Sequence, residues 1–307
     1  MRVALDLLGG DHAPEAVIDG ALLAVAQDPS VEVILVGPPD VAAALLAARG
    51  ASLPVVSATE SVGMDEDPAR GVRAKRDATV RTIHRLVREG ALTGQSTGQG
   101  DGGADVAVSV GPTGAVLAGA VLTLGRLTAR PAVAVVVPTP HGPVVLLDAG
   151  ATSETTPEQL VAYAVLGSAY AEALGVQQPR VGLLNVGSEP GKGDQLRKDA
   201  FALLLQAPVR FIGNVEGHDV PLGGPADVVV TDGFTGNVLL KAVEGATTRT
   251  DLPRAALLVG VDGLSVVGHG AASAADVAAC VLHAADLARQ GLMPRLREVL
   301  SGRREAS

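Results

Sequence analysis

Residues 226–245 read ADVVVTDGFTGNVLLKAVEG. A short run rich in valine leads into Asp232, two glycines follow within four residues, and an amphipathic pattern then begins. The apolar run predicts a buried strand at 226–231, and the pattern after it predicts a helix at 235–245. A glycine-bearing turn between a buried strand and a helix is typical of α/β proteins.

The same alternation of apolar runs and amphipathic segments continues through all 307 residues. The other predicted strands are 2–7, 32–37, 104–110, 132–138, 143–148, 180–186, 209–213 and 264–267. The other predicted helices are 14–27, 40–48, 68–89, 114–125, 156–174, 194–206 and 273–299. Because the strands are continuous Val, Leu and Ile runs, we expect helices to cover both faces of the sheet. The sequence predicts a three-layer α/β/α fold with a mostly parallel sheet, which is mixed because 132–138 and 143–148 form a hairpin.

Composition argues against several classes of protein. A net charge of −9 and an aromatic content of 2% disfavour a nucleic-acid-binding protein. The chain reaches Asp6 too early for a signal peptide and has no apolar run of about 18 residues, so we expect a cytoplasmic protein. The single cysteine, Cys280, lies in an apolar helical pattern that indicates a buried thiol. The sequence has no metal-ligand spacing of His, Cys or carboxylate residues, so we expect no metal site.

The segments that follow the predicted strands are rich in glycine and polar residues. Ligands of open α/β sheets bind beyond the carboxyl ends of the strands, and the free N–H groups at helix starts suit an anion. The sequence therefore predicts an anion-binding cleft at this edge. His269 is one candidate residue of the cleft, and the alternative for its side chain is a hydrogen bond to the backbone of its own loop. The candidate residues are Gly9, Gly10, Asp11, His12, Ser109, Thr113, Gly114, Asn214, Glu216, Asp232, Gly233, Thr235, Gly236, His269 and Gly270.

Two side chains in these loops are candidates for contact with a reacting group. The chain has four lysines against twenty arginines, and Lys192 lies between two glycines, which favours a role for a compact ammonium group. The alternative is a solvated loop lysine. Asn237 lies where a helix begins, so its alternative role is an N-terminal cap, although Thr235 could also fill that position.

The segment 70–88, RGVRAKRDATVRTIHRLVR, carries seven basic residues and one acid. Arg81, Arg85 and Arg88 share one face of the predicted helix, and we expect His84, which lies among them, to be solvated. A basic segment in an acidic protein indicates an acidic partner or an anionic substrate. The alternative is a solvated helix face.

Nine stretches, taken together and in order, resemble the PlsX family of phosphate acyltransferases. They are ALDLLGGDHAPEAVIDGAL, GMDEDPARGVRAKRDATV, AVSVGPTGAVLAGA, RPAVAVVVPT, VVLLDAGATSETTPEQLVAYAVLGSAYA, PRVGLLNVGSEPGKGDQLRKDAFALL, FIGNVEGHDV, DVVVTDGFTGNVLLKAVEG and LLVGVDGLSVVGHGAASAADVAAC. They span nearly the whole chain. The resemblance implies transfer of a long-chain acyl group from acyl carrier protein to inorganic phosphate, as a step toward phospholipids.

The resemblance also implies a Rossmann-like fold related to the isopropylmalate dehydrogenases and phosphotransacetylases, and a homodimer that needs no metal or other cofactor. With phosphate as the nucleophile, Lys192 would neutralise charge on phosphate or on the oxyanion, and the Asn237 amide would orient the same group. The basic segment would attract the acidic carrier protein. Its candidate docking residues are Arg73, Lys75, Arg76, Arg81, Arg85 and Arg88.

The chain departs from the family pattern at three places. Pro112 stands where the family usually has Asn, and 93–103 is expected to be a flexible insertion. A short join at 246–257 replaces a long helical pair that is implicated in dimer contacts and peripheral membrane attachment. We otherwise expect one α/β domain over 1–307. Two alternative functions remain open: a phosphotransacetylase-like enzyme acting on short acyl-CoA, and a degenerate homologue that binds the carrier protein without turnover.

Overall fold

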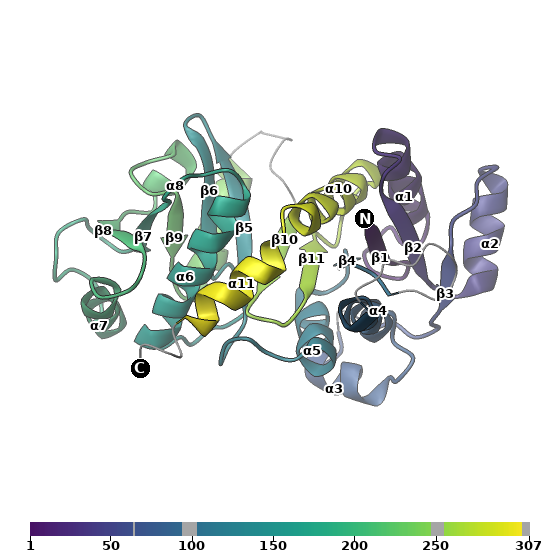
Figure 1. Ribbon diagram of the computed structural model, residues 1–307, viewed down its shortest axis with the longest axis horizontal. Coiled ribbons are helices and arrows are strands. Elements are labelled where there is room, and N and C mark those ends of the chain that lie inside the picture. Colours follow the sequence, from purple (N-terminus) through teal and green to yellow (C-terminus); the bar gives the residue numbers. More distant parts are fainter. Residues whose placement is uncertain (64, 94–102, 247–254, 303–307) are drawn as a thin grey trace. The chain divides into compact units, whose positions relative to one another are not determined.

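The computed structural model of the chain describes residues 1–63, 65–93, 103–246 and 255–302 (Figure 1). Its contacts group into two compact units, each described by itself here. Unit 1 comprises Met1–Arg126 and Arg254–Gln290, and unit 2 comprises Leu127–Pro253 and Gly291–Ser307. Most of the predicted insertion at 93–103 and most of the predicted short join at 246–257 lie outside the described residues.

Unit 1 is built on a six-stranded part of the sheet, in the spatial order β3-β2-β1-β4-β11-β10. All neighbouring strands run parallel except β10 and β11. The central β1 is buried along its whole length, as a strand covered on both faces must be. The bounds are β1 (Arg2–Asp6), β2 (Glu32–Gly37), β3 (Val55–Ser57), β4 (Val106–Ser109), β10 (Ala255–Val259) and β11 (Leu264–Gly268).

Helices cover both faces of the unit 1 sheet (Figure 1). One face holds α1 (Glu15–Gln27), α2 (Pro39–Ala48) and α10 (Ala274–Arg289), and the other holds α3 (Pro68–Ala74), α4 (Thr79–Thr93) and α5 (Thr113–Leu124). On the α4 face, Ile83 and Leu86 pack against Ala4 and Ile34 of the sheet. Cys280 on α10 is buried as predicted, and burial raises the pKa of its thiol to about 12.

Unit 2 contains strands in the order β5-β6-β9-β7-β8, and here too helices lie on both faces. The predicted hairpin is confirmed, because β5 and β6 pair antiparallel while the remaining neighbours run parallel. The strands are β5 (Ala132–Thr139), β6 (Gly142–Leu147), β7 (Arg180–Leu184), β8 (Arg210–Val215) and β9 (Val228–Val230). Helix α6 (Pro157–Ala173) covers one face and carries α7 (Gln195–Leu204) and α11 (Leu292–Ser301), and α8 (Asp219–Leu222) and α9 (Gly233–Ala246) cover the other.

The predicted mixed, mostly parallel sheet with flanking helices is therefore confirmed, with three differences in detail. Strands β3 and β10 and helix α8 are not predicted from the sequence, and of these β3 and α8 are short, with 3 and 4 residues. The predicted helix at 68–89 is two helices, because the Asp77 carboxylate between them accepts hydrogen bonds from the backbone N–H and the hydroxyl of Thr59, both at 2.7 Å. The predicted helix at 273–299 is also two, separated by Gly291 at a φ of +67°.

The expectation that His84 is solvated is wrong. Its side chain is fully buried, with Nδ1 at 2.5 Å from the Val80 carbonyl oxygen and Nε2 at 2.9 Å from the Ser265 hydroxyl. Because a carbonyl can only accept, Nδ1 carries the proton and Nε2 accepts from Ser265. Burial lowers the pKa of His84 to about 4, so the imidazole is neutral in the folded protein.

His84 should make the folded protein less stable in mild acid. Its pKa is lower in the folded state than in the unfolded chain, so its contribution is fully present above about pH 6.5 and is lost as the pH falls toward 4. We expect a loss of about 2 kcal/mol between about pH 7.5 and pH 5. Denaturant unfolding of wild type and His84→Gln at both pH values measures it. The loss should shrink in His84→Gln but persist in His141→Gln, which changes an exposed histidine; equal losses in all three proteins would contradict the assignment.

Candidate functional site

In unit 1, three parallel strands end at one edge and their exit loops are tied together. The Ser109 hydroxyl donates to the Asp6 carboxylate at 2.7 Å, and the Asp11 N–H donates to the Gly270 carbonyl at 2.7 Å. A Cβ at Gly9 would lie 2.9 Å from both the Asp6 carboxylate and the Ser109 hydroxyl, so the loops pack closely there. Burial raises the pKa of Asp6, against the hydrogen bonds from Ser109 and the loop N–H groups.

The other unit 1 candidates lie at the exposed rim of the same loops. His12, Thr113, Gly114 and His269 are exposed. The Nδ1 of His269 accepts a hydrogen bond from the Ala271 N–H at 3.2 Å, which is the loop-bonding alternative considered above. Unit 1 thus brings Gly9 and Ser109 together at the buried Asp6 carboxylate. Gly10 and Asp11 lie against Gly270, and the two histidines stay at the surface.

In unit 2, the loop after β6 is organised by Asp148, a residue that the sequence analysis did not select. Its side chain is fully buried and accepts hydrogen bonds from the N–H groups of Val133, Gly150, Ala151 and Thr152 at 2.8–3.0 Å. The Thr152 hydroxyl adds another at 2.8 Å. A buried carboxylate with this many donors is fully satisfied, so Asp148 fixes the shape of the loop.

Helix α9 begins directly against that loop. Asp232 caps the helix, because its carboxylate accepts from both the N–H and the hydroxyl of Thr235 at 2.8 Å. A Cβ at Gly236 would collide with the Asp148 carbonyl, and one at Gly233 with the backbone of Thr152. The two glycines of the 226–245 stretch therefore let the first turn of α9 pack against the Asp148 loop.

Asn237 is not the cap of α9, because Asp232 fills that role. The Asn237 Nδ2 donates to the Ala149 carbonyl oxygen at 3.1 Å, and the residue is exposed. Since a carbonyl can only accept, this contact fixes the amide orientation and leaves Oδ1 and one N–H for another group. Asn237 thus presents both an acceptor and a donor beside the loop that Asp148 organises.

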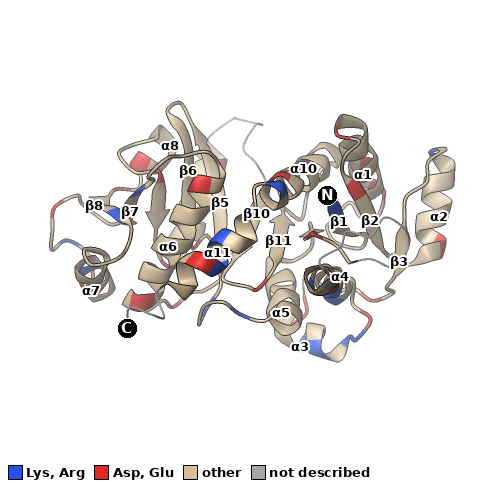
Figure 2. Ribbon diagram, viewed as in Figure 1, with Lys and Arg blue, Asp and Glu red and all other residues tan. Residues whose placement is uncertain are grey.

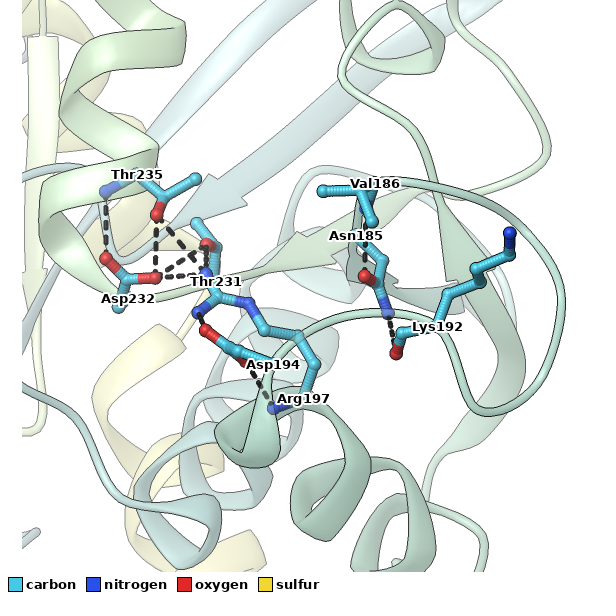
Figure 3. A network of polar contacts seen from close by, with 8 residues as sticks. All are labelled: Asn185, Val186, Lys192, Asp194, Arg197, Thr231, Asp232 and Thr235. Carbon is cyan, nitrogen blue, oxygen red and sulfur yellow. Dashed lines mark hydrogen bonds and ion pairs between the residues drawn. The ribbon is translucent and has the colours of Figure 1, made fainter.

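Lys192 lies in the loop after β7, with its backbone held and its side chain exposed. Gly191 and Gly193 on either side of it have φ of +87° and +90°, which glycine adopts without strain. The Asn185 amide donates to the Lys192 carbonyl at 3.0 Å. The lysine side chain is 53% exposed, its ammonium lies 4.0 Å from the Glu189 carboxylate, and it points away from Asp232 and Thr235 (Figure 3).

Asn214 and Glu216 lie at the end of β8, and each takes part in shaping a loop. The Asn214 amide is buried and donates to the Glu189 carbonyl at 2.9 Å, so it holds the far side of the Lys192 loop. The Glu216 N–H donates to the Asp219 carboxylate at 2.8 Å.

Arg197 is the main residue of this region that the sequence analysis missed. It lies on the first turn of α7, its side chain is 12% exposed, and its guanidinium forms ion pairs with Asp194 and Asp232 (Figure 3). Burial raises the pKa of Asp232, but its bonds to Thr235 and the charge of Arg197 outweigh this and the net pKa is lowered. In the sequence, the sign of a role for Arg197 is Asp194, which lies three residues earlier at the start of the helix. Such a pair is common on helix surfaces and does not reveal the contact with Asp232.

A groove of about 880 Å³ in unit 2 lies apart from these residues. It is lined by α6, the end of α7 and α11, including Val161, Val165, Leu203 and Val299, and by none of the candidate site residues. Among the described residues, no group of three His, Cys, Asp or Glu side chains is placed to hold a metal ion. No described helix has the length and apolar character needed to cross a membrane.

Comparison with known proteins gives the family. The model of the family described as "Fatty acid synthesis protein" matches residues 1–251. The phosphate acyltransferase of Desulfitobacterium hafniense (strain Y51) is 39% identical over 98% of this chain and 97% of its own length. That of Heliobacterium modesticaldum (strain ATCC 51547 / Ice1) is 38% identical over 99% of both chains. The chain belongs to the phosphate acyltransferase (PlsX) family.

Solved structures agree on the fold. A phosphotransacetylase from Streptococcus pyogenes superposes with a TM-score of 0.67 at 16% identity, over 94% of each chain. The alignment with the Desulfitobacterium hafniense relative runs over 339 residues, more than the 307 of this chain, so that relative carries residues with no counterpart here. The homodimer and the peripheral membrane association implied by the family resemblance stay predictions.

Replacing Asn237 by Asp should impair the enzyme. The substitution puts a second acceptor against the Ala149 carbonyl, so the side chain loses its fixed orientation. The exposed carboxylate can turn toward water, and because a misplaced reacting group can cost about 100-fold in rate, we expect kcat to fall by about 10- to 100-fold. Steady-state acyltransferase kinetics measure this, and Lys241→Gln, one turn further along α9 and exposed, is the control. Full turnover in Asn237→Asp would contradict the role of the amide.

Proposed function

We propose that this enzyme transfers a long-chain acyl group from acyl carrier protein to inorganic phosphate and so supplies acyl phosphate for phospholipid synthesis. The observation that carries the proposal is the similarity, at 39% identity over 98% of this chain, to a protein named phosphate acyltransferase. The acyl carrier protein donor rests on the family resemblance of the nine sequence stretches.

The reaction needs no nucleophile from the enzyme. A phosphate oxygen attacks the thioester carbonyl, a C–O bond forms, the C–S bond breaks, and the carrier thiolate takes a proton. The enzyme must hold a dianion against a carbonyl and stabilise the oxyanion that develops on it. A cation and a fixed amide on neighbouring strand exits suit this task.

In the proposed mechanism Lys192 and Asn237 contact the reacting groups. Among the described residues, the partner given for the Lys192 ammonium is Glu189, at a distance of 4.0 Å, so the ammonium is available to neutralise phosphate or the oxyanion. The free N–H of Asn237 then donates to the same group. Asp232 carries negative charge beside Arg197, so we assign it and the neighbouring Gly233 and Gly236 to holding α9 in place rather than to binding phosphate. The candidate residues in the unit 1 loops, which follow β1, β4 and β11, stay predicted to bind phosphate.

An assay with purified protein and two acyl donors tests the proposal. We expect phosphate-dependent formation of acyl phosphate from long-chain acyl carrier protein, and little from acetyl-CoA. Lys192→Ala should lower kcat by about 100-fold, the usual effect of removing one group that stabilises the oxyanion, without loss of secondary structure by circular dichroism. Preference for acetyl-CoA would favour a phosphotransacetylase-like enzyme, and carrier-protein binding without turnover a degenerate homologue. A folded Lys192→Ala protein with full turnover would refute the role of the lysine.

The basic segment 70–88 supports docking of the acidic carrier protein. Its basic side chains fall into two groups, those with a partner in the protein and those without one among the described residues. Four of its basic side chains have partners: Lys75 pairs with Glu66, Arg81 donates to the Val72 carbonyl, Arg85 pairs with Glu89, and Arg88 donates to the Thr123 carbonyl. The other three, Arg70, Arg73 and Arg76, are exposed without a side-chain partner among the described residues. Figure 2 shows basic positions, in blue, along the ribbon of α3. Arg70 and Arg73 line a hollow on α3. We therefore propose that α3 and Arg76 after it form the docking surface, in place of the face of Arg81, Arg85 and Arg88.

Charge reversal distinguishes the two faces. Arg73→Glu combined with Arg76→Glu should raise the KM for acyl carrier protein by about tenfold and leave the KM for phosphate unchanged, because steering acts on the charged macromolecule. Arg85→Glu combined with Arg88→Glu is the matched control, since it also reverses two charges, at side chains that already have partners. An equal rise in both proteins, or a rise in the phosphate KM, would count against docking at α3.

A further inference from the structure

Arg197 has more side-chain contacts than its place on the first turn of α7 requires. One terminal nitrogen donates to the Asp194 carboxylate at 2.9 Å. The other forms the ion pair with Asp232 and lies 3.3 Å from the Thr231 hydroxyl and 3.2 Å from the Thr235 hydroxyl. Figure 3 shows the guanidinium between the two carboxylates. Its planar fork can bind both at once, which a lysine ammonium does less well.

The two carboxylates belong to the two segments that carry the proposed catalytic side chains. Asp194 is the N-cap of α7 and lies two residues after Lys192. Asp232 caps α9, which presents Asn237. Arg197 therefore connects the Lys192 loop to the Asn237 helix through a single guanidinium.

The other anchors of these segments lead elsewhere. The Lys192 loop is held by Asn185 and Asn214, at the ends of β7 and β8. Asn237 is held by Ala149, in the loop after β6. Among the described residues, the side-chain hydrogen bonds that join 185–198 to 231–237 all come from Arg197. In the sheet, β9 lies between β6 and β7. Arg197 therefore links the loops anchored at β7 and β8 to the helix anchored at the loop after β6.

We propose that Arg197 is a positioning residue that sets the placement of Lys192 relative to Asn237 during acyl transfer. The inference rests on the proposed function for its catalytic consequence. A displacement of about 1 Å in a reacting group can cost about 100-fold in rate, so a link of this kind acts on kcat. It need not change the KM for phosphate, because either segment can still contact the anion by itself.

The chain offers a matched control for this arginine. Arg180 forms an ion pair with Asp227, with two hydrogen bonds of 2.9 Å, and so links the amino ends of β7 and β9. Arg197 links the segments that follow the carboxyl ends of the same two strands. Arg180→Gln therefore removes an ion pair from the same strand pair, at the edge opposite the site, although this pair is more exposed than that of Arg197 and Asp232.

Kinetics of three variants test the proposal. Arg197→Gln should lower kcat by about 30- to 100-fold, with the phosphate KM within about threefold of wild type. Arg197→Lys, which keeps the charge but not the fork, should recover part of the loss. Arg180→Gln should lower the melting temperature by less, because its ion pair is more exposed to solvent, and should leave kcat within about twofold. If kcat in Arg197→Gln is unchanged, or if it falls only in step with stability as in Arg180→Gln, Arg197 is structural and the proposal fails.

Hydrogen–deuterium exchange gives a readout that does not depend on activity. Arg197→Gln should speed exchange in peptides covering both 186–194 and 232–238, whereas Arg180→Gln should speed it in neither. Exchange that is unchanged in these peptides would overturn the linkage. Because this measurement needs no substrate, a wild-type protein that fails the acyl-donor assay refutes the proposed function but still leaves the linkage decided by exchange.

Discussion

Aspartates at the ends of the parallel strands hold the exit loops of this enzyme in shape. Each loop turns sharply after its strand, so its backbone N–H groups lose their partners in the sheet and need acceptors nearby. Asp6 at the end of β1, Asp148 after β6 and Asp232 after β9 supply those acceptors. The position that ends a strand thus also starts the next loop, and a carboxylate there satisfies several donors at once. In unit 2, Asp148 shapes the loop against which α9 packs and Asp232 caps α9, so the two carboxylates together fix the helix that carries Asn237.

The two glycines after Asp232 have a packing role that the sequence pattern does not reveal. The sequence places both among the candidate residues of the anion-binding cleft. In the structure a Cβ at either position would meet the loop after β6. The close approach is real, but it is between two parts of the protein, and Asn237 rather than the glycines faces outward. Only tertiary packing distinguishes these cases, because both need a residue without a side chain.

The sheet, the hairpin and the family can be predicted from the sequence, since all three depend on patterns that are local or repeated along the chain. Such prediction fails where a distant contact decides. His84 has the neighbours of a surface residue in sequence, yet it is buried against Ser265 of a strand that is remote in the chain. Arg197 has an ordinary partner at i−3, and its contact with Asp232 appears only when β7 and β9 are paired. The predicted helix at 68–89 is interrupted because Asp77 bonds Thr59, which no helical periodicity could reveal.

The buried thiol on α10 makes the protein well suited to site-specific labelling at introduced cysteines. Cys280 is the only cysteine of the chain, it is 1% exposed, and its raised pKa leaves almost no thiolate at neutral pH. Thiol-directed probes should therefore not react with the folded native protein. A cysteine introduced on the surface can then be labelled by itself, with a fluorophore or a spin label, without first removing a native residue. Motion of the loops at the strand ends becomes measurable in an otherwise unaltered enzyme.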